Sequence, residues 1–233
     1  MKDHQPHPLC LSAVKGLQHY LSTQKEWEHN FGLDAQRSGP IIGKMFGVLV
    51  AENPQKEIKH LWAFSGKLAD KNIFSRFVPP VFDTLAENGF LGAGMNKLAE
   101  MSAEIKSLKE NQPKGYEKHL KTLKNDRKNF SVSLQNQLFE SYHFLNQAGE
   151  EKSLLDIFKA AGYKNPPAGA GECAAPKLLQ HAFLHQLKPL ALTEFWWGQS
   201  PKSATWKHGH FYAPCKEKCE PILKHMLEGI CGI

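Results

Sequence analysis

The chain has 233 residues, of which 41% are hydrophobic and 22% are charged, and its formal net charge is +6 at pH 7. This length fits one large domain or two small ones, and no run approaches the roughly 18 apolar residues that a membrane span needs. The first residues lack a basic head followed by an apolar stretch, so we expect no signal peptide and a cytoplasmic location. Stable disulfides are disfavoured there, so clustered cysteines indicate a metal site or buried thiols.

The N-terminal part of the chain predicts a helix followed by a β-hairpin. Apolar residues recur at spacings of three and four over 8–31, which is typical of an amphipathic helix. An apolar run over 43–51, a turn at Asn53 and Pro54, and a second run over 57–65 predict two antiparallel strands. Because the first run is apolar at consecutive positions, we expect its strand to be covered on both faces.

The middle of the chain predicts an antiparallel helical hairpin. Two charged segments with apolar stripes, 96–111 and 116–147, are separated by Pro113 and Gly115. Basic residues crowd the start of the second segment and form either a solvated helix face or an edge that binds phosphate. They are Lys114, Lys118, Lys121, Lys124, Arg127 and Lys128.

The C-terminal part alternates helices with one strand. We expect helices over 153–161, 173–186 and 215–228, a buried strand over 189–197, and a loop over 198–212. The whole pattern predicts an α+β fold, in which the β-hairpin and this further strand pack with helices around an inserted helical hairpin. The expected parts are 1–91 and 151–233 for the core and 92–150 for the insertion.

Three of the five cysteines lie at the starts of two predicted helices. Cys215 and Cys219 are four residues apart, so on a helix their side chains face the same way. With Cys173, and with His208 or His210 as a fourth ligand, they would form a tetrahedral site for a structural zinc ion. The alternative is that these cysteines are buried thiols that pack as small hydrophobes. No GxGxxG, P-loop, GxSxG or HExxH motif is present, and we predict no catalytic residue.

Aromatic residues near the C-terminus lie among cationic ones, between 195 and 212. Aromatic faces beside cations can stack bases and hold phosphates, although part of this cluster would equally serve as strand core. With the basic edge of the helical hairpin, these residues are the predicted RNA contacts: Lys202, Trp206, Lys207, His208, Lys121, Lys124, Arg127 and Lys128.

Long stretches of the chain resemble the N-terminal extension of long RluA-type RNA pseudouridine synthases. They are PHPLC (6–10), GKMFGVLV (43–50), LWAFSGKLA (61–69), FVPPVFD (77–83), KNDRKNFSVSLQNQLFESYHFLN (124–146), PPAGAGECAAPKLLQHAFLHQLKPLALTEFWWGQSP (166–201) and KHGHFYAPCKEKCEPILKHMLEG (207–229).

The resemblance implies a role in RNA modification, the isomerisation of uridine to pseudouridine. The catalytic domain of that family carries an Arg-Leu-Asp motif, which this chain lacks, so no catalytic residue carries over. The resemblance therefore implies a noncatalytic accessory domain that helps a separate synthase catalytic domain to engage ribosomal or transfer RNA. Such an accessory domain is expected to require no cofactor and no membrane.

The order of elements also resembles the core of the zinc-dependent cytidine deaminases. In that resemblance Cys173 takes the first ligand position, and Pro214, Cys215 and Cys219 take the second motif. The position of the catalytic glutamate falls on Ala175, and the cysteine pair is spaced by three residues instead of two. A divergent zinc-dependent deaminase-like enzyme is therefore an alternative function, and a protein-interaction module built on the helical hairpin is another.

Overall fold

The computed structural model describes residues 5–229 and divides the chain into two compact units. One unit comprises the chain up to Val81 and from His143 onward, and the other comprises Phe82–Tyr142. The expected α+β class with an inserted helical hairpin is confirmed. The inserted unit begins and ends earlier than the expected 92–150.

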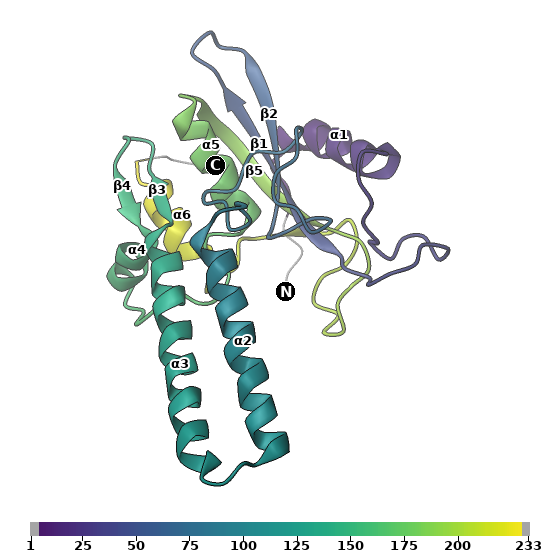
Figure 1. The fold of residues 1–233 in the computed structure, drawn as a ribbon. Coiled ribbons are helices and arrows are strands. Elements are labelled where there is room, and N and C mark those ends of the chain that lie inside the picture. The colour runs from purple at the N-terminus through teal and green to yellow at the C-terminus, as the bar shows by residue number, and fades with distance from the viewer. Residues whose placement is uncertain (1–4, 230–233) are drawn as a thin grey trace. The chain divides into compact units, whose positions relative to one another are not determined.

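The first unit is built on a four-stranded antiparallel sheet with the order β2-β1-β5-β6, and β3 pairs with β4 separately. Figure 1 shows the elements along the chain. The strands are β1 (Lys44–Glu52), β2 (Ile58–Phe64), β3 (His143–Leu145), β4 (Glu151–Ser153), β5 (Lys188–Trp197) and β6 (Phe211–Tyr212). The helices are α1 (Cys10–Thr23), α4 (Leu154–Ala160), α5 (Ala174–Leu184) and α6 (Glu220–Met226).

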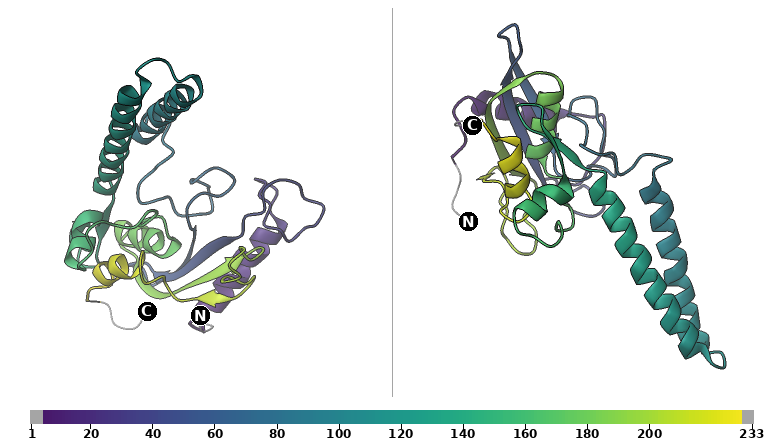
Figure 2. Two further views of the ribbon diagram at one scale, coloured as in Figure 1. Left: turned by 90° about the horizontal axis from the view of Figure 1, so that it is seen from below. Right: turned by 90° about the vertical axis from the view of Figure 1, so that its left-hand side faces the viewer.

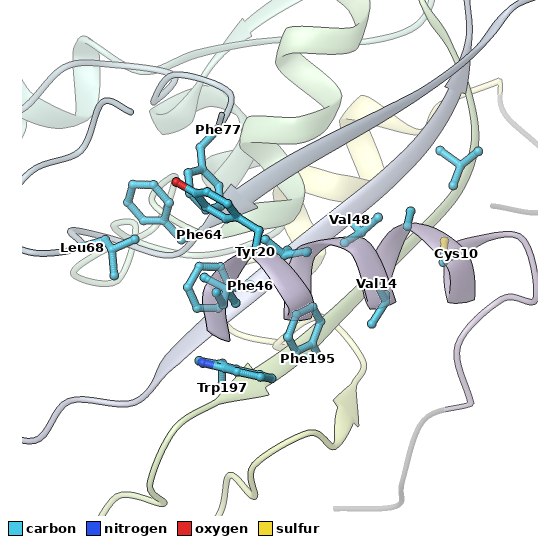
Figure 3. Packing of buried hydrophobic residues seen from close by; sticks show 14 of the residues in the cluster. Cys10, Val14, Tyr20, Phe46, Val48, Phe64, Leu68, Phe77, Phe195 and Trp197 are labelled. Carbon is cyan, nitrogen blue, oxygen red and sulfur yellow. The ribbon is translucent and has the colours of Figure 1, made fainter. Parts of the chain in front are cut away.

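The sheet lies between α1 on one face and α5 on the other (Figures 1 and 2). Alternate residues of β1, including Phe46 and Val48, pack with α1 in one aromatic-rich core (Figure 3). Gly47 points the other way, where an added Cβ would lie 2.9 Å from Ala174 Cβ and from Leu178 Cδ1. The prediction that this strand is covered on both faces is confirmed.

Two predicted helices are shorter in the structure. The helix predicted over 8–31 ends at Thr23, because Gln24 is extended and its side-chain carbonyl accepts the N–H groups of Glu26 and Trp27. The helix predicted to reach 147 ends at Glu140, and the next residues form β3 and pair with β4. A local turn thus ends α1, whereas pairing with a later strand follows the end of α3.

The last helix begins later than predicted. We expected it from 215, but α6 begins at Glu220, and residues 216–219 form turns. Pro221 suits the first turn of a helix, where its missing N–H group would have no partner within the helix. The predicted loop over 198–212 also ends in β6, which pairs with β5.

The second unit is a helical hairpin of α2 (Phe90–Asn111) and α3 (Tyr116–Glu140). The helices approach closely at Gly94, where an added Cβ would lie 2.5 Å from Leu134 Cδ1. The Lys97 ammonium lies 4.7 Å from the centre of the Phe130 ring, which ties the two helices further. None of the helices within residues 5–229 is long and apolar enough to cross a membrane.

Candidate metal centre

Two helix N-termini and one turn position the three cysteines. Cys173 is the N-cap residue of α5, and Cys219 is the N-cap residue of α6. Cys215 lies one turn before Cys219, and its carbonyl accepts the N–H groups of both Cys219 and Glu220 at 3.1 Å. The turn thus replaces the predicted helix at Cys215 but still places Cys215 and Cys219 side by side.

The three sulfurs lie within 4.8 Å of one another, and those of Cys215 and Cys219 are 3.3 Å apart. Zinc–thiolate bonds of about 2.3 Å in a tetrahedral site place sulfurs roughly 3.8 Å apart. Small side-chain movements therefore suffice to bring all three sulfurs onto one ion. Among residues 5–229 this is the one group of three or more histidine, cysteine or acidic side chains close enough to hold a metal.

The cysteines share hydrogen bonds that separate their protonation states. Bonds to the side chains of Cys173 and Cys219 lower the pKa of Cys215, and the N–H groups of Lys218 and Cys219 lower it further. The same sulfur–sulfur bonds raise the pKa of Cys219, and the bond to Cys215 raises that of Cys173. Metal binding at this cluster would be pH-dependent, because thiols lose their protons when they ligate an ion.

The structure does not bring His208 to the cysteines, although the sequence suggested it as a fourth ligand. Its Nδ1 atom accepts the N–H of Gly198 at 3.1 Å, and its ring lies edge-on to Trp197 with centroids 4.5 Å apart. His210 is not part of the cluster either. Within residues 5–229 the site therefore offers three thiols and leaves a fourth position for a molecule from solution.

A carboxylate that the sequence analysis missed lies beside the cysteines. Glu194 is on β5 opposite Gly47, so its side chain points to the face covered by α5. It is 5% exposed, and its Oε1 accepts the N–H of Ala175 at 3.0 Å, in the first turn of α5. Burial raises the pKa of Glu194 to about 7. A lone acidic residue within a mostly apolar strand is the sequence signal that could have revealed it.

The cysteines open onto a cavity of about 160 Å³. Its lining is Met45, Ser65, Cys173, Glu194, Trp196, Trp206, Ala213, Cys215 and Cys219. The rings of Trp196 and Trp206 are stacked, with centroids 5.9 Å apart and planes 17° apart. The predicted metal cluster and the predicted aromatic cluster, which were inferred from separate patterns, therefore line the same cavity.

A buried lysine holds the chain around this cavity in place. Lys177 on α5 is 2% exposed, and its Nζ donates to the carbonyls of Phe64 at 3.1 Å and Gly66 at 3.3 Å. The carboxylate of Glu172 lies 3.7 Å from the same Nζ atom. Lys177 thus fastens the turn that follows β2, where Ser65 lines the cavity, to the helix that begins at Cys173.

The remaining predicted RNA contacts fall in both units. Lys202 and Lys207 are exposed on the segment that carries Trp206, and the Lys207 N–H donates to the Tyr212 hydroxyl at 2.7 Å. The other four lie on the exposed surface of α3: Lys121, Lys124, Arg127 and Lys128. The Arg127 Nε donates to Ser102 Oγ at 2.7 Å, which leaves the rest of its guanidinium for other partners.

Comparison of the chain with protein-family models, with curated proteins and with solved structures gave no match. Its function must therefore be inferred from the chemistry of the cavity and its surroundings.

Proposed function

We propose that this chain binds a zinc ion through Cys173, Cys215 and Cys219 and holds an unpaired RNA base in the adjoining cavity. In this proposal it is an accessory domain that works with an RNA pseudouridine synthase. The observation that carries the proposal is the gathering of three sulfurs within 4.8 Å at a cavity lined by Trp196 and Trp206.

The donor set supports zinc. Thiolates are soft ligands that favour zinc over magnesium or calcium, and three of them leave a fourth position in a tetrahedral site. A zinc ion there would tie the start of α5 to the turn before α6, and so would fix two walls of the cavity. It would thereby hold the shape in which the cavity receives a base.

The surroundings of the cavity support RNA as the partner. Stacking of a base on an aromatic side chain contributes about 1–3 kcal/mol, and Trp206 offers such a surface beside the exposed Lys202 and Lys207. The net charge of +6 favours a polyanion. The resemblance to the synthase extension points to the same partner.

Metal analysis of the purified protein tests the zinc site. We expect about one zinc per chain, and Cys215→Ser should lose it because two thiolates bind the ion far more weakly than three. Cys10→Ala is the matched control, since Cys10 is the buried first residue of α1 and lies outside the cluster. A wild-type protein that folds without metal and takes up none from solution would contradict this part of the proposal.

Binding of single-stranded RNA tests the partner. We expect the affinity to fall steeply with added salt, as phosphate contacts require, and Trp206→Ala to weaken binding by about 5- to 150-fold. Tyr163→Ala, which removes an exposed aromatic ring that packs on Phe158, should leave the affinity unchanged. If the wild-type protein does not bind single-stranded RNA, or binds it with an affinity that does not depend on salt, the RNA part of the proposal is wrong.

A hydrolytic enzyme is the second candidate, and Glu194 is the observation that favours it. A zinc site with an open fourth position is typical of catalysis, and Glu194 places an acid/base group in the same cavity although Ala175 stands where deaminases carry one. Incubation of cytidine-containing RNA with the zinc-loaded protein would then yield uridine. Glu194→Gln should abolish that conversion while zinc content stays the same, and absence of conversion by the wild type would remove this candidate.

A further inference from the structure

The cavity beside the cysteines contains a hydrogen-bond acceptor that the protein leaves free. One oxygen of Glu194 accepts the N–H of Ala175, whereas the other has no hydrogen-bond partner among residues 5–229. The residue is nevertheless 5% exposed and lines the cavity. This oxygen is not among the fully buried atoms without a partner in the described residues, so it is reached from the cavity, where a ligand with a donor group can bind it.

We infer that Glu194 selects the base in the cavity, favouring one that presents an amino group, as cytosine does, over uracil. This inference rests on the proposed function. A carboxylate only accepts hydrogen bonds, and the amino group of cytosine is a donor at the position where uracil has a carbonyl. Uracil would therefore set an oxygen against the free oxygen of Glu194.

The position of Glu194 is fixed firmly enough for it to discriminate between cytosine and uracil. Its backbone belongs to β5 and is paired with Gly47 of β1 and with Tyr212 of β6, and its first carboxyl oxygen is held at the start of α5. Ser65 is the other hydroxyl or carboxyl group on the wall, and a hydroxyl both donates and accepts. Among the side chains of the wall, Glu194 is therefore the one whose oxygens only accept.

The rest of the wall suits a flat ring and excludes phosphate. Trp196 and Trp206 supply aromatic faces, and Met45 and Ala213 supply apolar contacts. A phosphate would meet the carboxylate of Glu194, which repels an anion. The RNA backbone is better placed along the exposed side chains of Lys202 and Lys207, outside the cavity.

The test compares the binding of two ten-nucleotide RNAs, oligo(C) and oligo(U), to the zinc-loaded protein at pH 8. We expect the wild type to bind oligo(C) about tenfold more tightly, which is about 1.4 kcal/mol. In Glu194→Gln the amide both donates and accepts, so the preference should shrink to within about twofold, mainly through tighter binding of oligo(U). Glu217→Gln, which changes an exposed residue on the turn between Cys215 and Cys219, should keep the wild-type preference.

The outcomes separate this inference from the proposed function. Equal binding of the two RNAs by the wild type, with both weakened by Trp206→Ala, would overturn the inference and leave the proposed function standing. No binding of either RNA would overturn both. Because the wild-type ratio needs no variant, the inference stays testable even if Glu194→Gln fails to fold, which its zinc content and circular dichroism would reveal.

Discussion

Glu194 shows how one buried residue links stability to the site. It lies in a mostly apolar strand, and its side chain accepts a backbone N–H that the first turn of α5 cannot satisfy within the helix. Cys173, the N-cap residue of α5, makes no side-chain capping bond, so Glu194 supplies the cap from another element. Burying the Glu194 side chain therefore costs free energy of desolvation, whereas its hydrogen bond to Ala175 caps the N-terminus of α5.

We predict that the burial of Glu194 destabilises the folded protein more at high pH than at low pH. The pKa of Glu194 rises from 4.5 to about 7 on folding because burial disfavours the charged form. Between these values the folded chain binds the proton more tightly than the unfolded chain, so this residue lowers the free energy of unfolding as the pH rises. Glu194→Gln lacks this effect. The free energy of unfolding of Glu194→Gln, relative to that of the wild type, should therefore rise by up to about 3 kcal/mol from pH 4 to pH 8.

Urea unfolding of the chelator-treated proteins at both pH values measures this difference. Glu217→Gln serves as the control, because Glu217 is exposed and its replacement should change the unfolding free energy by the same small amount at each pH. A difference between Glu194→Gln and wild type that stays constant with pH would contradict the assigned cause.

At the level of elements, the placement of α5 decides where Cys173 lies. The helix packs closely over Gly47, is fastened to the turn after β2 by Lys177, and takes a carboxylate from β5 at its N-terminus. These three contacts come from β1, β2 and β5. The cysteine cluster is therefore positioned by the sheet as a whole, and a shift of one strand would move Cys173.

We predict that Gly47→Ala destabilises the protein by about 1–3 kcal/mol, because the added methyl group would overlap Ala174 and Leu178 and displace α5. The zinc affinity should fall with it, since Cys173 moves with the helix. Gly16→Ala on α1 is the opposite case. Its methyl group would lie 3.6 Å from Trp62, so the gain in helix propensity of about 0.5–1 kcal/mol should dominate.

Chemical denaturation of the two variants, together with zinc titration, measures both effects. Similar changes in unfolding free energy for Gly47→Ala and Gly16→Ala would show that the approach of α5 to β1 has more room than the structure indicates.

At the level of the whole molecule, the chain carries predicted RNA contacts in two separate units. The aromatic cavity with Lys202 and Lys207 belongs to one, and the basic edge of α3 belongs to the other. The hairpin is held together by its own contacts, including the side chain of Leu134 against the backbone of Gly94. The charge of the hairpin can therefore be changed while the cysteine cluster stays as it is.

We predict that neutralising the edge of α3 reduces the salt dependence of RNA binding. The variant replaces Lys121, Lys124, Arg127 and Lys128 by Gln. The slope of log K against log salt should become shallower by up to about 3, because each phosphate of a single strand that a cation neutralises adds about 0.7 to it. Zinc content should match that of the wild type. An unchanged slope would show that this edge is only a solvated helix face.

Most elements of the fold could be predicted from the sequence because they depend on local patterns. The strands around 43–51 and 189–197, the helical hairpin and the helix after Cys173 follow from periodicity and from Pro and Gly punctuation. The predicted end of the second helix of the hairpin was wrong, because strand pairing with a later part of the chain replaces the helix there. The end of α3 gives way to β3, whose partner β4 comes later in the chain.

The sequence by itself determined which residues are candidates for metal and RNA binding, since cysteines, tryptophans and lysines are recognised by type and spacing. Only the tertiary structure decided which of them meet. It gathered Cys173 with Cys215 and Cys219, left His208 against Trp197, and brought Glu194 to the same cavity. The physical reason is that burial and strand register act across the sheet, and they set the direction of a side chain through partners that are distant in sequence.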